Sequence, residues 1–395
     1  MKLSYMTVMI AISALALPIS GIAQKATDSN QAPKYLITAL GALGGTSAAA
    51  NSINDRGWVL GAGDLAGNTT SHAALWIDGK TVDLGTLGGP SSSVAWSSVK
   101  NNSGAIAGIS DTSIVDPLGE VWSCAGGGFF PTSSGHTCQG FVWKDHIMRA
   151  LPTLGGNNGF AAGDNNAGQI AGWAENTTHD PTCVAPQVLQ FEAVVYGPKP
   201  NEIQPLPPLA GDVDGAATAI NNQGQVVGIS GICGTAVGGA TATHAVLWEN
   251  GSPIDMGNLG GVAWNTPTAI NNHGVVVGFS DLPGDSAASP NYHAFIWTKA
   301  GGMTDLGTLP GDSFSVAWGI NEKGQVAGQS IDASGASRAF IWQNGVMTDL
   351  NTLVESPLSL VYANDINDSG EIAGGAYNAA TGNSPAFLAV PVKTP

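Results

Sequence analysis

The sequence predicts an all-β protein, a seven-bladed β-propeller with four antiparallel strands in each blade. Three phrases each occur seven times in a fixed order: a Leu-Gly-Thr-Leu-Gly-Gly-like segment, an Ile-Asn-x-x-Gly segment and an apolar segment that usually ends in Trp. The copies recur about every 50 residues, a period typical of propellers and related arrays. Glycine accounts for 55 of 395 residues, which suits many short strands joined by tight turns. No segment shows a convincing helical period.

Each repeat reads as four strands, which we name a to d. Strand a precedes Ile-Asn, as in "SVAWGIN" (315–321), and strand b follows the Gly, as in "QVAGQS" (325–330). Strand c is the phrase "HAFIW" (293–297), and strand d is "VMTDL" (346–350). Asn-x-x-Gly is a hairpin signal between strands a and b, and Asp-Gly or Asn-Gly is one between strands c and d.

The two ends of the propeller segment complement each other. "KYLITALG" (34–41) matches strand d, and the final strand "AFLAVPV" (386–392) matches strand c. We therefore expect residues 34–41 to complete the last blade, which closes the ring and protects strand edges. An open array would need caps instead of complementary ends. The predicted propeller spans residues 34–392.

Residues 1–23 read as a secretory signal peptide. Lys2 is followed by an apolar stretch over residues 6–18 and a small-residue end at Ala23. Residues 24–33 are then a linker, and no later segment approaches the length of a membrane span. The mature protein is expected to be a secreted or periplasmic monomer.

Charge is sparse and negative, with 13 basic and 29 acidic residues and a net charge of −16. This balance excludes nucleic acid and anionic membrane surfaces as expected partners.

Added length falls in the b–c loops, roughly 110–139, 173–191, 230–243 and 280–292, which contain no Lys or Arg. Most basic residues fall in the a–b and c–d turns, on the opposite side of a propeller. Because extra length on one side of a repeat array marks a binding side, we predict that this long-loop face is the working face; the alternative is an acidic surface kept for solubility.

Four cysteines in an exported chain predict two disulfides. Cys124 and Cys138 lie in one b–c loop, whereas Cys183 and Cys233 lie in b–c loops of adjacent blades. The repeat register therefore favours the bonds Cys124–Cys138 and Cys183–Cys233.

Aromatic residues of the predicted long-loop side are candidate ligand contacts. Trp96, Trp264 and Trp318 have even offsets from their repeat glycines, which predicts that they share one side of their strands. They either pack between blades or form a stacking platform for sugar rings. Phe129 and Phe130 either form an exposed apolar contact or cover the channel mouth.

Histidines divide into two groups. His72, His244 and His293 occupy one repeat position and are spread around the ring, so we expect structural hydrogen bonds there instead of a shared metal. His136 and His179 lie in the long loops and are the histidine candidates for ligand binding.

Two loop segments suit calcium, "GDVDG" (211–215) and "DLPGDS" (281–286), because they combine carboxylates with flexible glycines. The candidate ligands are Asp212, Asp214, Asp281 and Asp285. Neither segment matches a complete calcium-loop pattern, and no other cofactor is predicted.

The phrases "HAFIW", "MTDLGTL" and "INNHGVVVGFS" resemble the HAF family of bacterial extracellular repeat proteins. The resemblance implies export and a repeat fold, and it implies little about activity. The chain departs from the pattern where His becomes Gln139, Glu192, Arg338 or Pro385, and where Ile becomes Lys100 or Asp164.

Enzyme signatures are mostly absent, since the chain has no Gly-x-Ser-x-Gly, His-Glu-x-x-His or Cys-x-x-Cys segment. The sequence favours an exported, non-catalytic binding or interaction propeller, whose long-loop face takes a neutral glycan, a cation or a protein. The alternative is a glycan-active enzyme, a hydrolase or lyase, that uses acidic residues of the same face. A structural envelope component without a discrete ligand is the third possibility.

Overall fold

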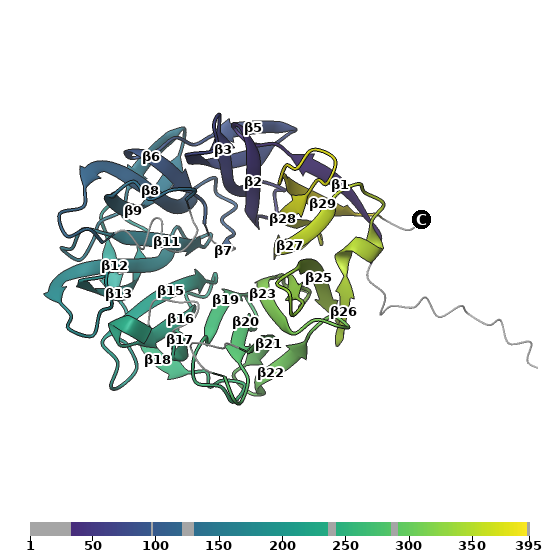
Figure 1. Cartoon of the computed structure of the whole chain (residues 1–395). Helices are drawn as coiled ribbons and strands as arrows, with labels where there is room; N and C mark the ends of the chain where they lie inside the picture. Colours follow the sequence, from purple (N-terminus) through teal and green to yellow (C-terminus); the bar gives the residue numbers. More distant parts are fainter. Residues whose placement is uncertain (1–32, 96–97, 121–129, 236–241, 286–290, 393–395) are drawn as a thin grey trace, which may run out of the picture. The chain divides into compact units, whose positions relative to one another are not determined.

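Seven antiparallel sheets follow one another around a common axis, which confirms the predicted seven-bladed propeller (Figure 1). The structure, a computed structural model, describes residues 33–95, 98–120, 130–235, 242–285 and 291–392. In each blade the strands pair in the order a, b, c, d, and in blades 4 and 5 this order leads from the axis to the rim (Figure 1).

The strands have the following bounds in the first three blades. Blade 1 is β2 (Gly44–Ile53), β3 (Val59–Leu65), β4 (Ser71–Ile77) and β5 (Lys80–Asp83). Blade 2 is β6 (Gly88–Ser93), β8 (Ile106–Val115), β9 (His136–Lys144) and β10 (Ile147–Ala150). Blade 3 is β11 (Gly159–Asp164), β12 (Ile170–His179), β13 (Leu189–Tyr196) and β14 (Ile203–Pro205), with β7 (Ser98–Val99) added to its inner edge.

The other four blades each have four strands. Blade 4 is β15 (Asp214–Ile220), β16 (Val226–Gly231), β17 (His244–Glu249) and β18 (Ser252–Asp255). Blade 5 is β19 (Thr266–Ile270), β20 (Val276–Asp281), β21 (Tyr292–Thr298) and β22 (Gly302–Gly307). Blade 6 is β23 (Phe314–Ile320), β24 (Val326–Ile331), β25 (Ser337–Gln343) and β26 (Val346–Asp349). Blade 7 is β27 (Ser359–Ile366), β28 (Ile372–Tyr377), β29 (Ala386–Pro391) and β1 (Tyr35–Leu40).

The seventh blade closes as predicted, by antiparallel pairing of β1 with β29. Tyr35 lies opposite Pro391 and Leu40 lies opposite Ala386. Tyr35 also enters the apolar core that contains Phe387. The first strand of the described chain therefore supplies both hydrogen bonds and buried surface to the last blade.

A close contact between strands b and c explains part of the repeated phrases. The Phe of strand c is fully buried in blade 6, where Phe340 packs against Gly328 of strand b. A Cβ at Gly328 would lie 2.4 Å from Phe340 Cζ, so a side chain does not fit there. The Phe of "AFIW" and the Gly of strand b are thus two halves of one packing contact.

Two predicted loops are shorter than expected, because strand b continues into them. β8 runs to Val115 and β12 runs to His179, so Asp111 and Glu175 stand on strands instead of in loops. The added residues include Thr112 and other β-branched side chains, which favour extended backbone.

Strand a carries a β-bulge, which interrupts the alternation from which the common orientation of its aromatic residues was predicted. In blade 6 the register shifts between Ala317 and Gly319, at Trp318. In blade 5, Trp264 precedes β19 altogether. Even spacing predicts a shared side only for an unbroken strand, and a bulge shifts that alternation by one residue.

Candidate functional site

The Ile-Asn-x-x-Gly turns form a closed ring of hydrogen bonds at the end of the propeller that holds the a–b turns, which we call the turn face. Each Asn donates its Nδ2–H to the backbone oxygen of the equivalent Asn in the next blade, and Asn367 closes the ring onto Asn54 at 3.1 Å. The seven members are Asn54, Asn101, Asn165, Asn221, Asn271, Asn321 and Asn367. The repeated Asn is therefore a joint between blades.

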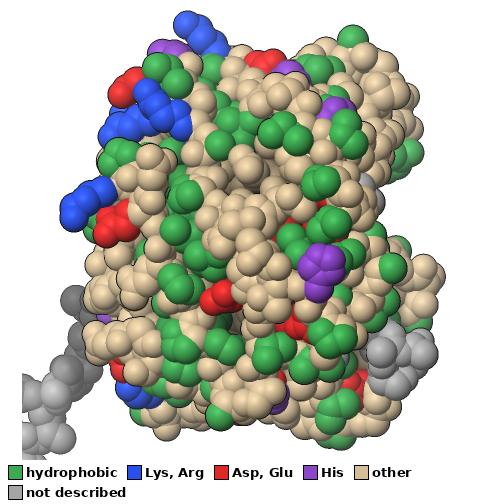
Figure 2. Space-filling view, turned by 90° about the vertical axis from the view of Figure 1, so that its left-hand side faces the viewer, with side chains coloured by type: hydrophobic (Ala, Val, Ile, Leu, Met, Phe, Trp, Pro, Cys, Tyr) green, Lys and Arg blue, Asp and Glu red, His purple; other side chains and the backbone are tan. Residues whose placement is uncertain are grey.

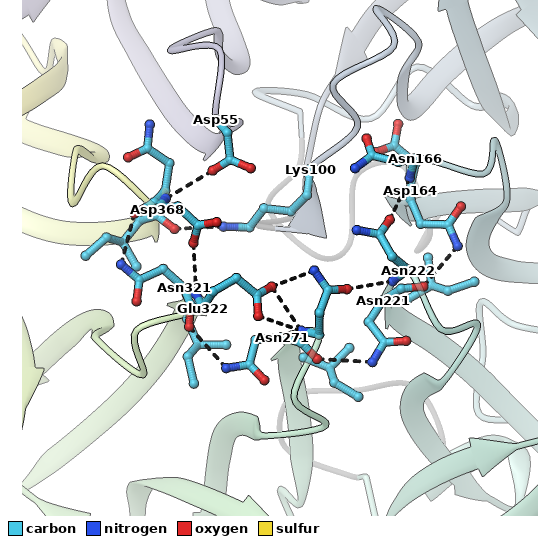
Figure 3. Close-up of a pocket in the computed structure, with 17 residues that line it drawn as sticks. Asp55, Lys100, Asp164, Asn166, Asn221, Asn222, Asn271, Asn321, Glu322 and Asp368 are labelled. Carbon is cyan, nitrogen blue, oxygen red and sulfur yellow. Dashed lines mark hydrogen bonds between the residues drawn. The ribbon is translucent and has the colours of Figure 1, made fainter.

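The next residue of each turn makes a second set of links. In six of the seven blades its backbone N–H donates to the side chain of the equivalent residue one blade further on, as from Asn166 to Asn222 Oδ1 at 2.9 Å. Between blades 1 and 2, Asn102 Nδ2 donates to Asp55 Oδ2 instead. Three members of this set are acidic: Asp55, Glu322 and Asp368. These carboxylates accept backbone hydrogen bonds while they face the axis (Figure 3).

A cavity of about 60 Å³ lies where these turns converge, and we call it the turn-face cavity (Figure 3). Its lining combines the two polar sets with Ile220, Ile270, Ile320 and Ile366, the isoleucines of the repeat. Sequence reasoning placed the working face at the other end of the propeller, so it missed this cavity. The available signal was the pair of charged residues that replace isoleucine in the repeat.

The first of these, Lys100, crosses blade 1 to reach blade 7. Its Nζ donates to Asp365 Oδ1 and to the backbone oxygen of Ile366. Asp365 is fully buried, and its Oδ2 accepts hydrogen bonds from Ser52 Oγ and Ile53 N. The ion pair therefore joins blade 2 to the seam at which the ring closes.

The second replacement, Asp164, leaves a carboxylate oxygen unused. Asp164 is 1% exposed and lines the turn-face cavity. Its Oδ1 accepts from Asn101 N at 2.8 Å, whereas Oδ2 has no hydrogen-bond partner among the described residues. Burial raises the pKa of Asp164 well above its usual value, although backbone N–H groups of Asn101 and Lys100 act in the opposite direction.

On the long-loop face, blades 5 and 6 share an aromatic group that we call the rim cluster: Trp264, Phe279, Tyr292, Phe314 and Trp318. Tyr292 stacks on Trp264 at 4.8 Å and on Phe314 at 5.2 Å between ring centroids. All members except the buried Phe279 are partly exposed. The structure thus brings the predicted Trp264 and Trp318 into one cluster, together with three aromatic residues that were not predicted.

Two predicted calcium ligands lie beside this cluster and interact with each other. Burial raises the pKa of Asp281 to about 8, and the negative charge of the neighbouring Asp285 contributes to the same shift. The interaction with Asp281 lowers the pKa of Asp285. At neutral pH the pair therefore holds one proton, on Asp281, and one negative charge, on Asp285.

The acid pair supports the loop that carries Trp264. Asp285 accepts hydrogen bonds from Val262 N and Ala263 N at 3.2 to 3.3 Å. Trp264 follows directly and has a φ of 48°, a left-handed conformation that is uncommon for a bulky residue. The contacts on both sides of Trp264 hold its ring against Tyr292.

The other predicted calcium ligands are bound to protein groups. Asp212 Oδ2 accepts from Ser230 Oγ and contacts His244 Nδ1 at 2.8 Å. Asp214 is buried, accepts from Phe191 N and has a pKa raised by burial to about 7. Within residues 33–95, 98–120, 130–235, 242–285 and 291–392, no three His, Cys, Asp or Glu side chains are grouped to hold a metal ion.

The histidines of the repeat make the expected structural hydrogen bonds. His72 contacts Asp83, and His293 contacts Asp305, both at 2.9 Å across the c–d hairpin. Arg338 replaces this His in blade 6 and pairs with Asp349 in the same way. The His of "HAF" and the Asp of "TDLG" are thus partners.

The histidine candidates of the long loops lie in different blades. His136 begins β9, and its charge opposes the effect of burial on Asp111, whose pKa is raised to about 6. His179 ends β12 and is exposed.

The predicted bond between Cys183 and Cys233 is present, with 4.6 Å between the Cα atoms, and links the b–c loops of blades 3 and 4. Cys138 is also disulfide-bonded, whereas Cys124 lies outside the described residues, as do Trp96 and Phe129. Phe130 is buried in a core cluster that includes Cys138 and residues of blades 3 and 4.

Lys and Arg side chains gather along one edge of the side view in Figure 2, and the opposite edge shows none. This distribution agrees with the predicted separation of charge between the two faces. No helix in the described part of the chain is long and apolar enough to cross a membrane.

No family model matches the sequence, and no curated protein sequence does. Among solved structures, the chain is similar to the β-propeller domain of the trilobed protease from Pyrococcus furiosus, described as having an open velcro topology, with 9% identity and a TM-score of 0.50 over 90% of this chain and 95% of that one. It is also similar to an acylaminoacyl peptidase from Pyrococcus horikoshii, with 11% identity and a TM-score of 0.51. That match covers 90% of this chain and 54% of the peptidase, so the chain spans about half of the peptidase. These likenesses establish a β-propeller fold for this chain and nothing about its activity.

Proposed function

We propose that this protein is a non-catalytic binding propeller that takes a neutral glycan at the rim cluster on its long-loop face. The observation that carries the proposal is the partly exposed stack of Trp264, Tyr292 and Phe314 beside the Asp281–Asp285 pair. Flat aromatic faces suit the apolar faces of sugar rings, and carboxyl oxygens suit their hydroxyl groups.

The charge of this face supports an uncharged ligand. Asp285 is ionised at neutral pH, and Arg338 nearby is already paired with Asp312 and Asp349. A polyanion would therefore meet negative charge without a free cationic partner at this rim.

The contacts of the acid pair argue against glycoside hydrolysis there. Asp285 accepts hydrogen bonds from Val262 N and Ala263 N, so its carboxylate supports the loop that carries Trp264. We therefore prefer binding to the glycan-active alternative.

We also propose that the protein is exported and belongs with the HAF repeat proteins. The repeated phrases, the signal-peptide character of residues 1–23 and the Cys183–Cys233 bond support this assignment.

A glycan-binding screen with the purified mature protein tests the proposed function. We expect a neutral glycan to bind and to be recovered intact, and Trp264→Ala to weaken binding at least tenfold, about 1.4 kcal/mol, through loss of stacking. Trp58→Ala is the matched control, because Trp58 lies at the a–b turn of blade 1, under Arg56, and should leave glycan binding unchanged. Equal binding by Trp264→Ala, or a cleaved product, would contradict the proposal.

A further inference from the structure

We infer that the turn-face cavity is a second binding site, which takes an alkylammonium group on Asp164. This site is independent of the proposed glycan site and lies at the opposite end of the propeller. Two buried carboxylates, Asp365 and Asp164, differ in whether they hold an ammonium group.

Lys100 shows how this cavity holds an alkylammonium group. Its Nζ contacts the buried Asp365 carboxylate and the backbone oxygen of Ile366, and its carbon stem extends past blade 1 (Figure 3). Ser52 Oγ and Ile53 N occupy the other oxygen of Asp365, so that carboxylate is fully satisfied. A buried anion and a carbonyl oxygen are thus sufficient here.

Asp164 offers the same features without the ammonium. It is 1% exposed, its Oδ1 accepts from Asn101 N, and its Oδ2 lacks a partner among the described residues. Asp164 lines the same cavity as the isoleucines of blades 4 to 6, Ile220, Ile270 and Ile320, which offer an apolar surface for a carbon stem.

The charges around the cavity favour a cation. Asp55, Glu322 and Asp368 line the same cavity as Asp164, and the single lysine of the lining, Lys100, is neutralised by Asp365. A chelated metal ion fits less well, because no group of three metal-ligating side chains occurs in the described residues. An ammonium group needs one carboxylate and additional oxygen acceptors, which the turn carbonyls supply.

Proton release distinguishes this site from a nonspecific negative surface. Burial raises the pKa of Asp164, and a bound ammonium ion should lower it again, because the ion favours the charged carboxylate. Binding should therefore be coupled to proton release in the pH range where the carboxyl titrates. In that range affinity should rise with pH, while the amine itself, with a pKa of about 10.4 as in lysine, stays charged.

The test is calorimetric titration of the full-length mature protein with n-butylammonium at pH 7, in two buffers of different ionisation enthalpy. We expect saturable binding of one ligand with proton release, a gain in affinity at pH 8, and no binding of n-butanol. Asp164→Asn should weaken binding at least tenfold and abolish proton release. Asp332→Asn removes a charge from an exposed loop on the other face and should change neither quantity.

Two further variants separate the possible outcomes. Asp164→Ile restores the repeat residue, so it should fold and fail to bind, even if Asp164→Asn alters stability. Trp264→Ala should retain ammonium binding, which keeps this result distinct from the glycan test. A lysine-containing peptide that binds more tightly than n-butylammonium would identify a protein side chain as the source of the group. Binding that survives Asp164→Asn and Asp164→Ile would overturn the inference.

Discussion

The two ends of this propeller use the same repeat in opposite ways. On the turn face, seven asparagines make one hydrogen bond seven times, and the ring closes without a gap. On the long-loop face, each blade is different: blades 3 and 4 share a disulfide, blades 5 and 6 share aromatic residues, and several blades bury a carboxyl group. In this chain the uniform positions join the blades, and the positions that vary supply the chemistry.

The turn face itself follows this rule. Its regular positions are structural, and its candidate site arises where two blades depart from isoleucine, at Lys100 and Asp164. In a repeat protein, the residues that differ from the repeated sequence thus indicate a candidate site more clearly than the repeated residues do.

The largest loss of stability is expected when Lys100, which replaces the isoleucine of the repeat, is changed. Lys100→Met leaves the fully buried Asp365 carboxyl without its cation, which should lower the free energy of unfolding by about 3–5 kcal/mol. Lys100→Met combined with Asp365→Asn should recover part of this loss. Denaturant unfolding measures both variants, and a loss below about 1 kcal/mol for the single variant would show that the ion pair does not hold the seam.

A break in the asparagine ring should have the next largest effect. Asn221→Ala removes the partners of Gln223 N, Gln225 N and the Asn271 oxygen, for an expected loss of about 3 kcal/mol. Asn258→Ala on the other face removes one exposed hydrogen bond to Gly260 N and should cost less than about 1 kcal/mol. Equal losses in chemical denaturation would erase the contrast between the faces.

A pH dependence is expected from the long-loop face. Burial raises the pKa of folded Asp281 from 3.8 to about 8, so between these values the folded state holds a proton that the unfolded state has lost. Stability should therefore fall as the pH rises toward 8. Asp281→Asn should remove the contribution of Asp281 to this dependence of stability on pH. The melting temperature of Asp281→Asn relative to the natural protein should increase from pH 5 to pH 8 and level off above it.

Asp332→Asn is the control for this measurement, because Asp332 is exposed and its hydrogen bonds to Ser334 lower its pKa. Its melting temperature relative to the natural protein should stay constant over the same range. If Asp281→Asn leaves the dependence of the melting temperature on pH unchanged, Asp281 is ionised over the whole range from pH 5 to pH 8.

The smallest effect is expected at the His–Asp pairs. His293→Ala removes an exposed contact with Asp305, which keeps its hydrogen bond from Gly307 N, so the loss should stay within about 1 kcal/mol. A loss as large as that of Asn221→Ala would show that these pairs, too, hold the ring together.

Sequence reasoning predicted the blade number, the closing strand and the Cys183–Cys233 bond, because each depends on repeat register alone. It placed Asp111 and Glu175 in loops, because the extension of strand b is decided by pairing with strand c. It missed the bulge at Trp318, which a strand adopts to contact its neighbour. It also missed the turn-face cavity, since hydrogen bonds between copies of a repeat cannot be read from any one copy.

The pairing of β1 with β29 has a consequence for biogenesis. β1 is the first strand of the propeller to be made and β29 is the last, so β1 finds its partner only after every other strand of the propeller has been synthesised. Until then one edge of the sheet stays open, and an assembling chain could pair there with another copy of itself. Closure is thus the last step in building the propeller, and its rate decides whether newly made molecules become single rings or mispaired multimers.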